Sequence, residues 1–251
     1  MLAGMYVGAA VVLILIVGAS LPDSVRRLTM GVCFGGALTM VVFAGSELFT
    51  GSNLILTLGV LTGKASVRGL GANWIYTWIG NWLGSVVLAI AVVRSGVLDA
   101  EPIRSFVVAT VARKMQLALP QLFWRAVLAN WLVCLGLWMA GRTKNDAARI
   151  LLIWWCMFTF ITCGYEHSVA NMSGLMLGLL LPHGSDVNLT GYAYNLAVTT
   201  GGNIVGGAVM VAGMYWFGSR EGAHRGQDHA VDPVETDTDR MPSESITLEA
   251  D

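Results

Sequence analysis

Charged residues are scarce in this sequence: Asp, Glu, Lys and Arg make up 12% of its 251 residues, about half of the share usual in globular proteins. A disordered chain, a charged coiled coil or a nucleic-acid-binding protein needs more charge, so these classes are excluded. An ordinary soluble enzyme is also disfavoured, because too few polar side chains remain to cover its surface.

Motifs for covalent or metal chemistry are also missing. The four cysteines contain no CxxC pair, so they are expected to act as small apolar residues without a disulfide or metal. The four histidines show no metal-ligand spacing. No Ser/His/Asp arrangement or phosphate-binding loop is present either. The sequence therefore predicts no enzyme activity, no cofactor and no metal.

Long uncharged runs are abundant instead. Residues 1–22, 28–46, 69–93 and 187–219 contain no Asp, Glu, Lys or Arg, and a membrane-spanning helix needs roughly 20 apolar residues. Two further stretches are interrupted once each, 28–63 by Glu47 and 150–185 by Glu166. The sequence thus predicts six membrane segments, of which the second and fifth are too long and too broken for simple helices. The six segments are expected at about 3–21, 28–62, 70–94, 121–141, 147–181 and 190–217.

The net charge of −1 hides two regions of opposite sign. Residues 1–217 hold 12 basic against 7 acidic residues, and 218–251 hold 3 against 9. The second region has the composition of a disordered acidic tail. No Lys or Arg precedes the first apolar run, which therefore reads as a true span and not a cleaved signal. Six spans place both termini on one side, and the distribution of basic residues slightly favours the cytoplasmic side.

The two interrupted segments resemble each other and indicate an internal repeat. Gly45 lies two residues before Glu47, and Gly164 lies two residues before Glu166. Downstream, GNWLG at 80–84 matches GNIVG at 202–206, whose paired glycines favour close approach of helices. The halves, about 1–96 and 120–217, each hold three spans. Because three is odd, they are expected to run in opposite directions, with a site near the midplane at the broken helices.

Three ionisable residues lie in apolar surroundings: Glu47, Glu166 and His167. We expect the carboxylates to accept the backbone N–H groups that a broken helix frees. His167 is the stronger functional candidate, because imidazole holds or releases a proton near neutral pH and donates a hydrogen bond to a passing anion. Thr50 is expected to face it.

Other polar residues have more than one interpretation. Asn130 and Asn171 lie among apolar residues, where helix-bridging hydrogen bonds are expected more than pore contacts. Arg125 stands at the start of a span, where it either draws anions by its charge or extends to the membrane interface.

Three motifs resemble signatures of the formate/nitrite transporter family. They are AGSELFTG at 44–51, NWLVCL at 130–135 and CGYEHSVANM at 163–172, and the resemblance extends over about 3–217. IWWC at 153–156 is closer to the nitrite-channel branch of the family. The resemblance implies an all-α integral membrane protein: an aquaporin-like six-helix protomer with an inverted 3+3 repeat and two broken helices. It also implies a homopentamer with one pore in each protomer.

The resemblance further assigns residue roles. His167 matches the central pore histidine, Thr50 lies opposite, and Asn130 and Glu166 match polar residues that support the histidine. Two apolar constrictions are implied, and the helix breaks are supported by Glu47, Gly45, Gly164 and Asn171. The constriction residues are Phe34, Leu38, Leu48, Phe49, Val133 and Phe160.

Two departures from the family stand out. Arg125 occupies a position, five residues before the Asn-Trp-Leu motif, where the family commonly has Lys; the charge is kept in a bulkier, more basic group. The family also usually has an amphipathic helix before the first span, whereas this sequence starts almost inside that span; either the start is misassigned or the helix is absent.

The function predicted from these features is a passive or proton-coupled pore for nitrite in a bacterial cytoplasmic membrane. Formate or hydrosulfide are the nearest alternative substrates. A neutral-solute channel of the aquaporin class is disfavoured, because the sequence contains no Asn-Pro pair. A sensor or scaffold that uses the acidic tail is a further alternative, and an intramembrane enzyme is the least favoured.

Overall fold

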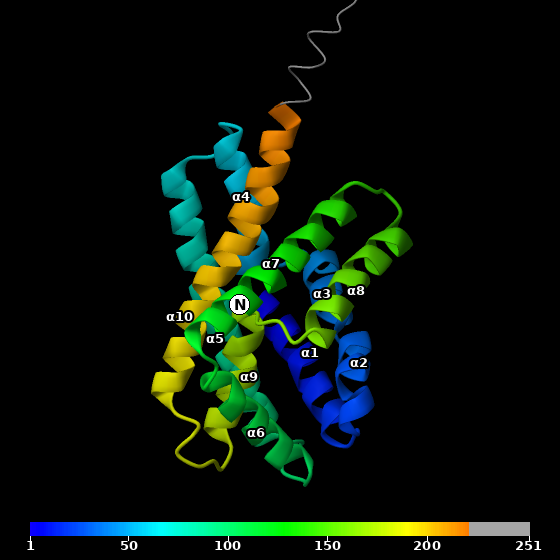
Figure 1. The fold of residues 1–251 in the computed structure, drawn as a ribbon, viewed down its shortest axis with the longest axis vertical. Helices are drawn as coiled ribbons and strands as arrows, with labels where there is room; N and C mark the ends of the chain where they lie inside the picture. Colours follow the sequence, from blue (N-terminus) through cyan, green and yellow to red (C-terminus); the bar gives the residue numbers. More distant parts are fainter. Residues whose placement is uncertain (221–251) are drawn as a thin grey trace, which may run out of the picture. The chain divides into compact units, whose positions relative to one another are not determined.

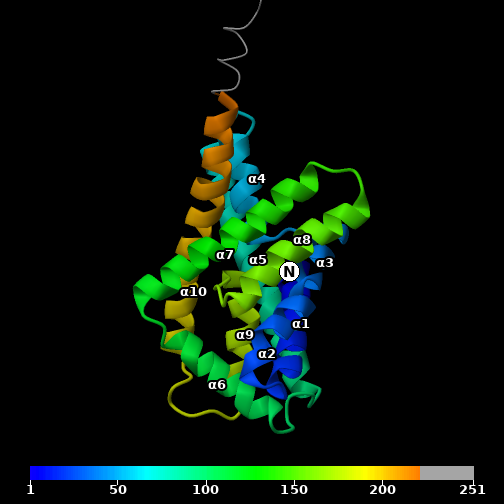
Figure 2. The ribbon, with the colours of Figure 1, turned by 45° about the vertical axis from the view of Figure 1, so that its right-hand side comes forward.

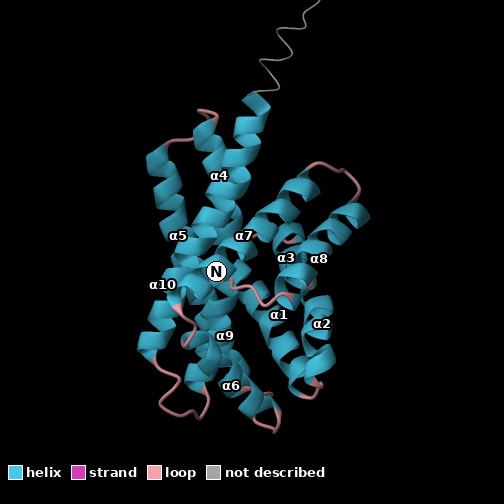
Figure 3. Ribbon diagram, viewed as in Figure 1, coloured by secondary structure: helices cyan, strands magenta, loops and turns pink. Residues whose placement is uncertain are grey.

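The computed structural model describes residues 1–220, and within them Figure 3 shows helices joined by loops, with no strand. The chain divides into a compact unit, Met1–Trp216, and a second unit, Phe217–Asp251. The acidic tail predicted over 218–251 lies outside the described residues from 221 onward. The description below concerns the first unit.

The helices follow the predicted spans, with one addition. Over the described residues, five helices are long and apolar enough to cross a membrane, and α8 with α9 forms the second broken segment. The stretch 95–120 connects the third and fourth predicted spans, and the sequence predicts a loop there; it contains α6 instead. The elements are α1 (Leu2–Ala19), α2 (Asp23–Phe34), α3 (Gly36–Phe43), α4 (Phe49–Leu61), α5 (Val67–Arg94), α6 (Ile103–Met115), α7 (Leu119–Gly141), α8 (Asp146–Thr162), α9 (Ser168–Leu180), α10 (Leu189–Ile204) and the π-helix η1 (Val205–Gly213).

Both predicted helix breaks are present and are built alike. After α3, Gly45 has φ +66°, and the Ser46 N–H reaches back to the Val41 carbonyl. After α8, Gly164 has φ +72°, and the Tyr165 N–H reaches the Phe160 carbonyl. This is the Schellman motif, in which glycine takes a left-handed conformation and the helix carbonyls are satisfied. The chain then runs extended and begins α4 or α9.

The two halves also pack alike. An ideal Cβ on Gly84 of α5 would lie 2.0 Å from the Met1 carbonyl oxygen, at the start of α1. One on Gly206 of η1 would lie 2.2 Å from the Val127 carbonyl oxygen of α7. These matched glycines therefore permit the close helix contacts that the GxxxG spacing predicted. Figure 1 shows α7 running next to both α10 and α8.

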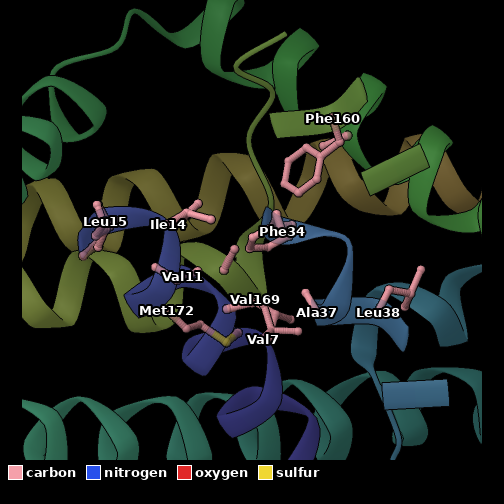
Figure 4. Packing of buried hydrophobic residues seen from close by; sticks show 14 of the residues in the cluster. Val7, Val11, Ile14, Leu15, Phe34, Ala37, Leu38, Phe160, Val169 and Met172 are labelled. Atoms are coloured by element: carbon pink, nitrogen blue, oxygen red, sulfur yellow. The ribbon is translucent and has the colours of Figure 1, made fainter. Parts of the chain in front are cut away.

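The apolar core lies where the two broken segments meet α1. Figure 4 shows Val7 and Val11 of α1, Phe34 of α2, Phe160 of α8 and Met172 of α9 converging there. The additional helix α6 packs beside α9 and α1, as Figure 2 also shows. This places α6 at the edge of a cavity that opens toward the second break.

Candidate functional site

A cavity of about 710 Å³ lies among α1, α2, α6, α7, α8, α9 and the second break. We call it the vestibule. Its inner end is lined by Phe160, Glu166 and His167, and an apolar wall comes from α1. Five cationic side chains line it against two carboxylates, those of Asp23 and Glu166. The cations are Arg26, Arg27, Arg113, Lys114 and Arg125.

Ion pairs neutralise only two of these cations. Arg26 pairs with Asp23, and Lys114 pairs with Glu166. In the part of the chain that the structure describes, Arg27, Arg113 and Arg125 form no ion pair. The vestibule therefore carries an excess of positive charge, which raises the local concentration of anions.

Glu166 anchors a buried polar network at the inner end of the vestibule. Lys114 Nζ donates to both carboxylate oxygens, at 2.8 and 2.7 Å, and Asn171 Nδ2 donates to one of them at 2.8 Å. The same Asn171 amide reaches Asn195 Oδ1, and Asn195 Nδ2 donates to the Lys114 carbonyl. The network joins α6, the second break, α9 and α10.

The breaks are held by asparagine amides and not by the carboxylates, which corrects the expectation for Glu47 and Glu166. Asn81 Oδ1 accepts from the Phe49 N–H at 2.9 Å, and its Nδ2 donates to the Glu47 carbonyl at 3.0 Å. A side-chain amide can pair with a free backbone N–H and a free carbonyl at the same time, because its oxygen accepts and its nitrogen donates. The carboxylate of Glu47 is exposed and has no hydrogen bond or ion pair among the described residues.

Asn203 holds the second break in the same way. Its Oδ1 accepts from the Ser168 N–H at 2.8 Å, and its Nδ2 donates to the carbonyls of Glu166 and Ala126 at 3.2 and 2.7 Å. Asn130 adds a cross-link between the halves, donating to the carbonyls of Asn203 at 2.6 Å and Thr50 at 3.3 Å.

His167 and Thr50 meet between the two breaks. His167 Nε2 lies 2.9 Å from Thr50 Oγ1, and both side chains are buried, with 4% and 0% exposed. His167 Nδ1 accepts the Ala170 N–H at the start of α9, at 3.2 Å. Because Nδ1 is an acceptor, the proton of the neutral ring sits on Nε2, which donates to Thr50. The ring can thus offer one N–H donor at the end of the vestibule.

The residues assigned to the constrictions are all buried. Phe34 and Phe160 pack edge to face with ring centroids 5.5 Å apart, and the Phe160 ring lies 5.9 Å from that of His167. Leu38 of α3, Leu48 of the first break, Phe49 of α4 and Val133 of α7 belong to the same apolar cluster.

The comparisons with known proteins agree with this architecture. The family model described as formate/nitrite transporter matches residues 1–217. The chain belongs to the formate/nitrite transporter family. It is 43% identical over 217 residues to the nitrite transporter NirC of Escherichia coli K12, covering 86% of this chain and 80% of the relative. It is 39% identical over 215 residues to a probable formate transporter of Methanothermobacter thermautotrophicus, covering 79% and 77%.

Solved structures of the family share the fold. An FNT family ion channel matches with a TM-score of 0.83 and 43% identity, over 86% of each chain. A pentameric formate channel with formate bound matches with a TM-score of 0.77 and 29% identity, over 87% of this chain and 94% of the other. The all-helical membrane architecture with two broken helices is therefore that of formate/nitrite transporter channels.

Sequence reasoning missed Lys114 and the roles of Asn81 and Asn203. Lys114 lies on α6, between two predicted spans, where the sequence pattern indicates no functional residue. Arg125, for which the sequence leaves two interpretations open, lines the vestibule and forms no ion pair among the described residues. The asparagines did carry a signal, since both lie in the repeated Gly-Asn motif, but only the glycines were given a role. Among the described residues, no group of three or more His, Cys, Asp or Glu could hold a metal.

Proposed function

We propose that this chain is a nitrite channel, with a pore through each protomer. The observation that carries the proposal is the buried His167–Thr50 pair at the inner end of a vestibule with excess positive charge. The 43% identity to a nitrite transporter, over most of both chains, supports nitrite as the anion.

The proposed permeation path begins with the vestibule, where unpaired Arg27, Arg113 and Arg125 attract the anion. The Phe34–Phe160 pair forms the first constriction and excludes hydrated ions by its size and lack of polar groups. His167 Nε2–H and Thr50 then donate hydrogen bonds that replace lost hydration. The second constriction is formed by Leu38, Leu48, Phe49 and Val133.

Formate is the second candidate substrate. The identity to a probable formate transporter and the likeness to a formate channel both favour it. Nitrite and formate are small bent monovalent anions with two terminal oxygens, so one N–H donor and one hydroxyl serve either.

The proposed assembly is a homopentamer in a bacterial cytoplasmic membrane, with both termini cytoplasmic and residues 1–217 as the channel domain. Support comes from the pentameric structural neighbour and the slight excess of basic residues in segments placed inside. The repeats of the channel domain are placed at about 1–96 and 120–217.

A side-by-side flux assay tests the proposed function. The purified protein in proteoliposomes is given nitrite, formate or hydrosulfide at several pH values, alone and in competition. We expect nitrite flux well above that of protein-free liposomes, and inhibition of it by excess formate. Absence of nitrite flux at every pH would overturn the assignment of nitrite.

A further inference from the structure

Trp154 of α8 contacts the chain next to Phe34, a residue of the first proposed constriction. Phe34 is the last residue of α2, and α3 begins only at Gly36, so the helical ladder is interrupted at Gly35. The carbonyl of Val32, one turn earlier, accepts a hydrogen bond from Trp154 Nε1 of α8 at 3.0 Å. A side chain that bonds into the ladder is a recognised cause of a local helix break.

The indole of Trp154 fills the space beside Gly35. An ideal Cβ on Gly35 would lie 1.9 Å from Trp154 Cδ1 and 2.8 Å from Cγ, whereas one on Gly36 would meet nothing within 4 Å. The indole also stacks on Phe158, with ring centroids 5.3 Å apart and planes at 12°, and it packs edge to face on Trp155 at 5.2 Å. Trp154 is therefore held in one position, and only glycine fits at 35.

This contact adjoins the constriction directly. Phe34 precedes Gly35 in sequence and packs on Phe160, which lines the vestibule beside His167. Trp154 itself does not line the vestibule. A displacement of Trp154 would shift Phe34 relative to Phe160 without touching the anion.

We propose that Trp154 is a positioning residue that sets the width of the Phe34–Phe160 constriction and thereby which small anions pass. The inference rests on the proposed channel function. It gives a role to one tryptophan of the IWWC motif at 153–156, which the permeation path leaves unused.

The test measures a ratio of fluxes, because loss of folded channels lowers all fluxes equally and leaves the ratio unchanged. Proteoliposomes carrying Trp154→Phe, which keeps a ring but lacks the N–H, are compared with wild type for acetate and nitrite. We expect the acetate-to-nitrite ratio to change by about threefold or more, the order expected for loss of one hydrogen bond. The matched control is Trp124→Phe, at a tryptophan of α7 that is 60% exposed and whose ring packs on Phe123, away from Trp154; this variant is expected to keep the wild-type ratio.

Two neighbouring glycines provide an independent test of the same proposal. Gly35→Ala forces Trp154 aside and is expected to change the ratio, whereas Gly36→Ala, with open space around its Cβ, is not. In a Trp154→Ala background, Gly35→Ala is expected to add no further change, because the clash is gone. If Trp154→Phe does not assemble, the two glycine variants decide.

Equal ratios for Trp154→Phe and Trp124→Phe, or for Gly35→Ala and Gly36→Ala, would overturn the proposal. Failure of the proposed function gives a different result from failure of this proposal. If nitrite is not a substrate, the wild-type protein passes no nitrite, and the role of Trp154 is then tested by the acetate-to-formate flux ratio.

Discussion

At the residue scale, Glu166 carries a buried charge whose free-energy cost must be offset by its hydrogen-bond partners. The Glu166 side chain is 4% exposed and lies among apolar helices. Taking a charge out of water is costly unless a partner compensates it. Lys114 contacts both of its oxygens, so removing Lys114 would leave a buried charge with only the Asn171 amide.

We therefore expect Lys114→Met to destabilise the protein. Removing one partner of a fully buried ion pair costs roughly 3–5 kcal/mol, and we expect less here because the Lys114 side chain is 31% exposed. The measurement is the thermal unfolding midpoint in detergent. Adding Glu166→Gln to Lys114→Met is expected to recover part of the loss, since no buried charge then remains.

The control for this prediction is an exposed ion pair. Arg104 and Glu101 lie 3.1 Å apart with side chains 40% and 53% exposed, and exposed pairs contribute about 0–1 kcal/mol. Arg104→Met should hardly move the midpoint. Equal shifts for Arg104→Met and Lys114→Met would contradict the account of Glu166.

At the scale of elements, the two helix breaks are one device built twice. Each consists of a Schellman glycine, an extended residue and an asparagine from the third membrane span of its repeat, α5 for the first break and α10 for the second. The two breaks differ in the number of hydrogen bonds: the Asn203 side chain makes three, one of them to the Ala126 carbonyl of α7, while the Asn81 side chain makes two.

We expect Asn203→Ala to destabilise the protein more than Asn81→Ala. A buried backbone group left without its hydrogen-bond partner costs about 1–3 kcal/mol. Asn203→Ala leaves three backbone groups without this side-chain partner, whereas Asn81→Ala leaves two. Thermal unfolding midpoints of the two variants, measured in the same detergent, check the order. A larger loss for Asn81→Ala would contradict the expected difference between the two helix breaks.

Sequence patterns predicted the breaks but not what holds them. Gly45 and Gly164, each two residues before an isolated Glu, marked where a helix cannot continue. The partner of the freed N–H groups depends on which side chain the third helix brings within 3 Å, and spacing along the chain carries no such information. α6 was missed because its charged residues, such as Arg113 and Lys114, resemble those of a loop.

At the scale of the whole molecule, the site combines distant parts of the chain. Thr50 comes from the first half and His167 from the second, and the sequence predicted that they face each other because the repeat places both at matched breaks. Lys114 comes from the connection between the halves. It lies outside the repeat, so no symmetry argument could place it beside Glu166.

A pore in each protomer predicts independent subunits. Wild-type and His167→Ala chains with different tags are co-expressed, and mixed assemblies are reconstituted at known ratios. We expect nitrite flux to fall in proportion to the fraction of His167→Ala chains. A steep loss, with little flux left at equal mixing, would indicate one shared pore and contradict the proposal. As a control, wild-type pentamers and His167→Ala pentamers are purified separately and mixed at the same ratios, which gives the flux expected when each subunit acts alone.

The central claim is that His167 provides the hydrogen-bond donor on which anion passage depends, and one measurement tests it most directly. Nitrite flux into proteoliposomes is followed across several pH values for wild type, His167→Ala and His183→Ala, whose histidine lies in an exposed loop. We predict pH-dependent flux for wild type and His183→Ala, and collapse of flux for His167→Ala at every pH. Unchanged flux of His167→Ala at every pH would contradict the account.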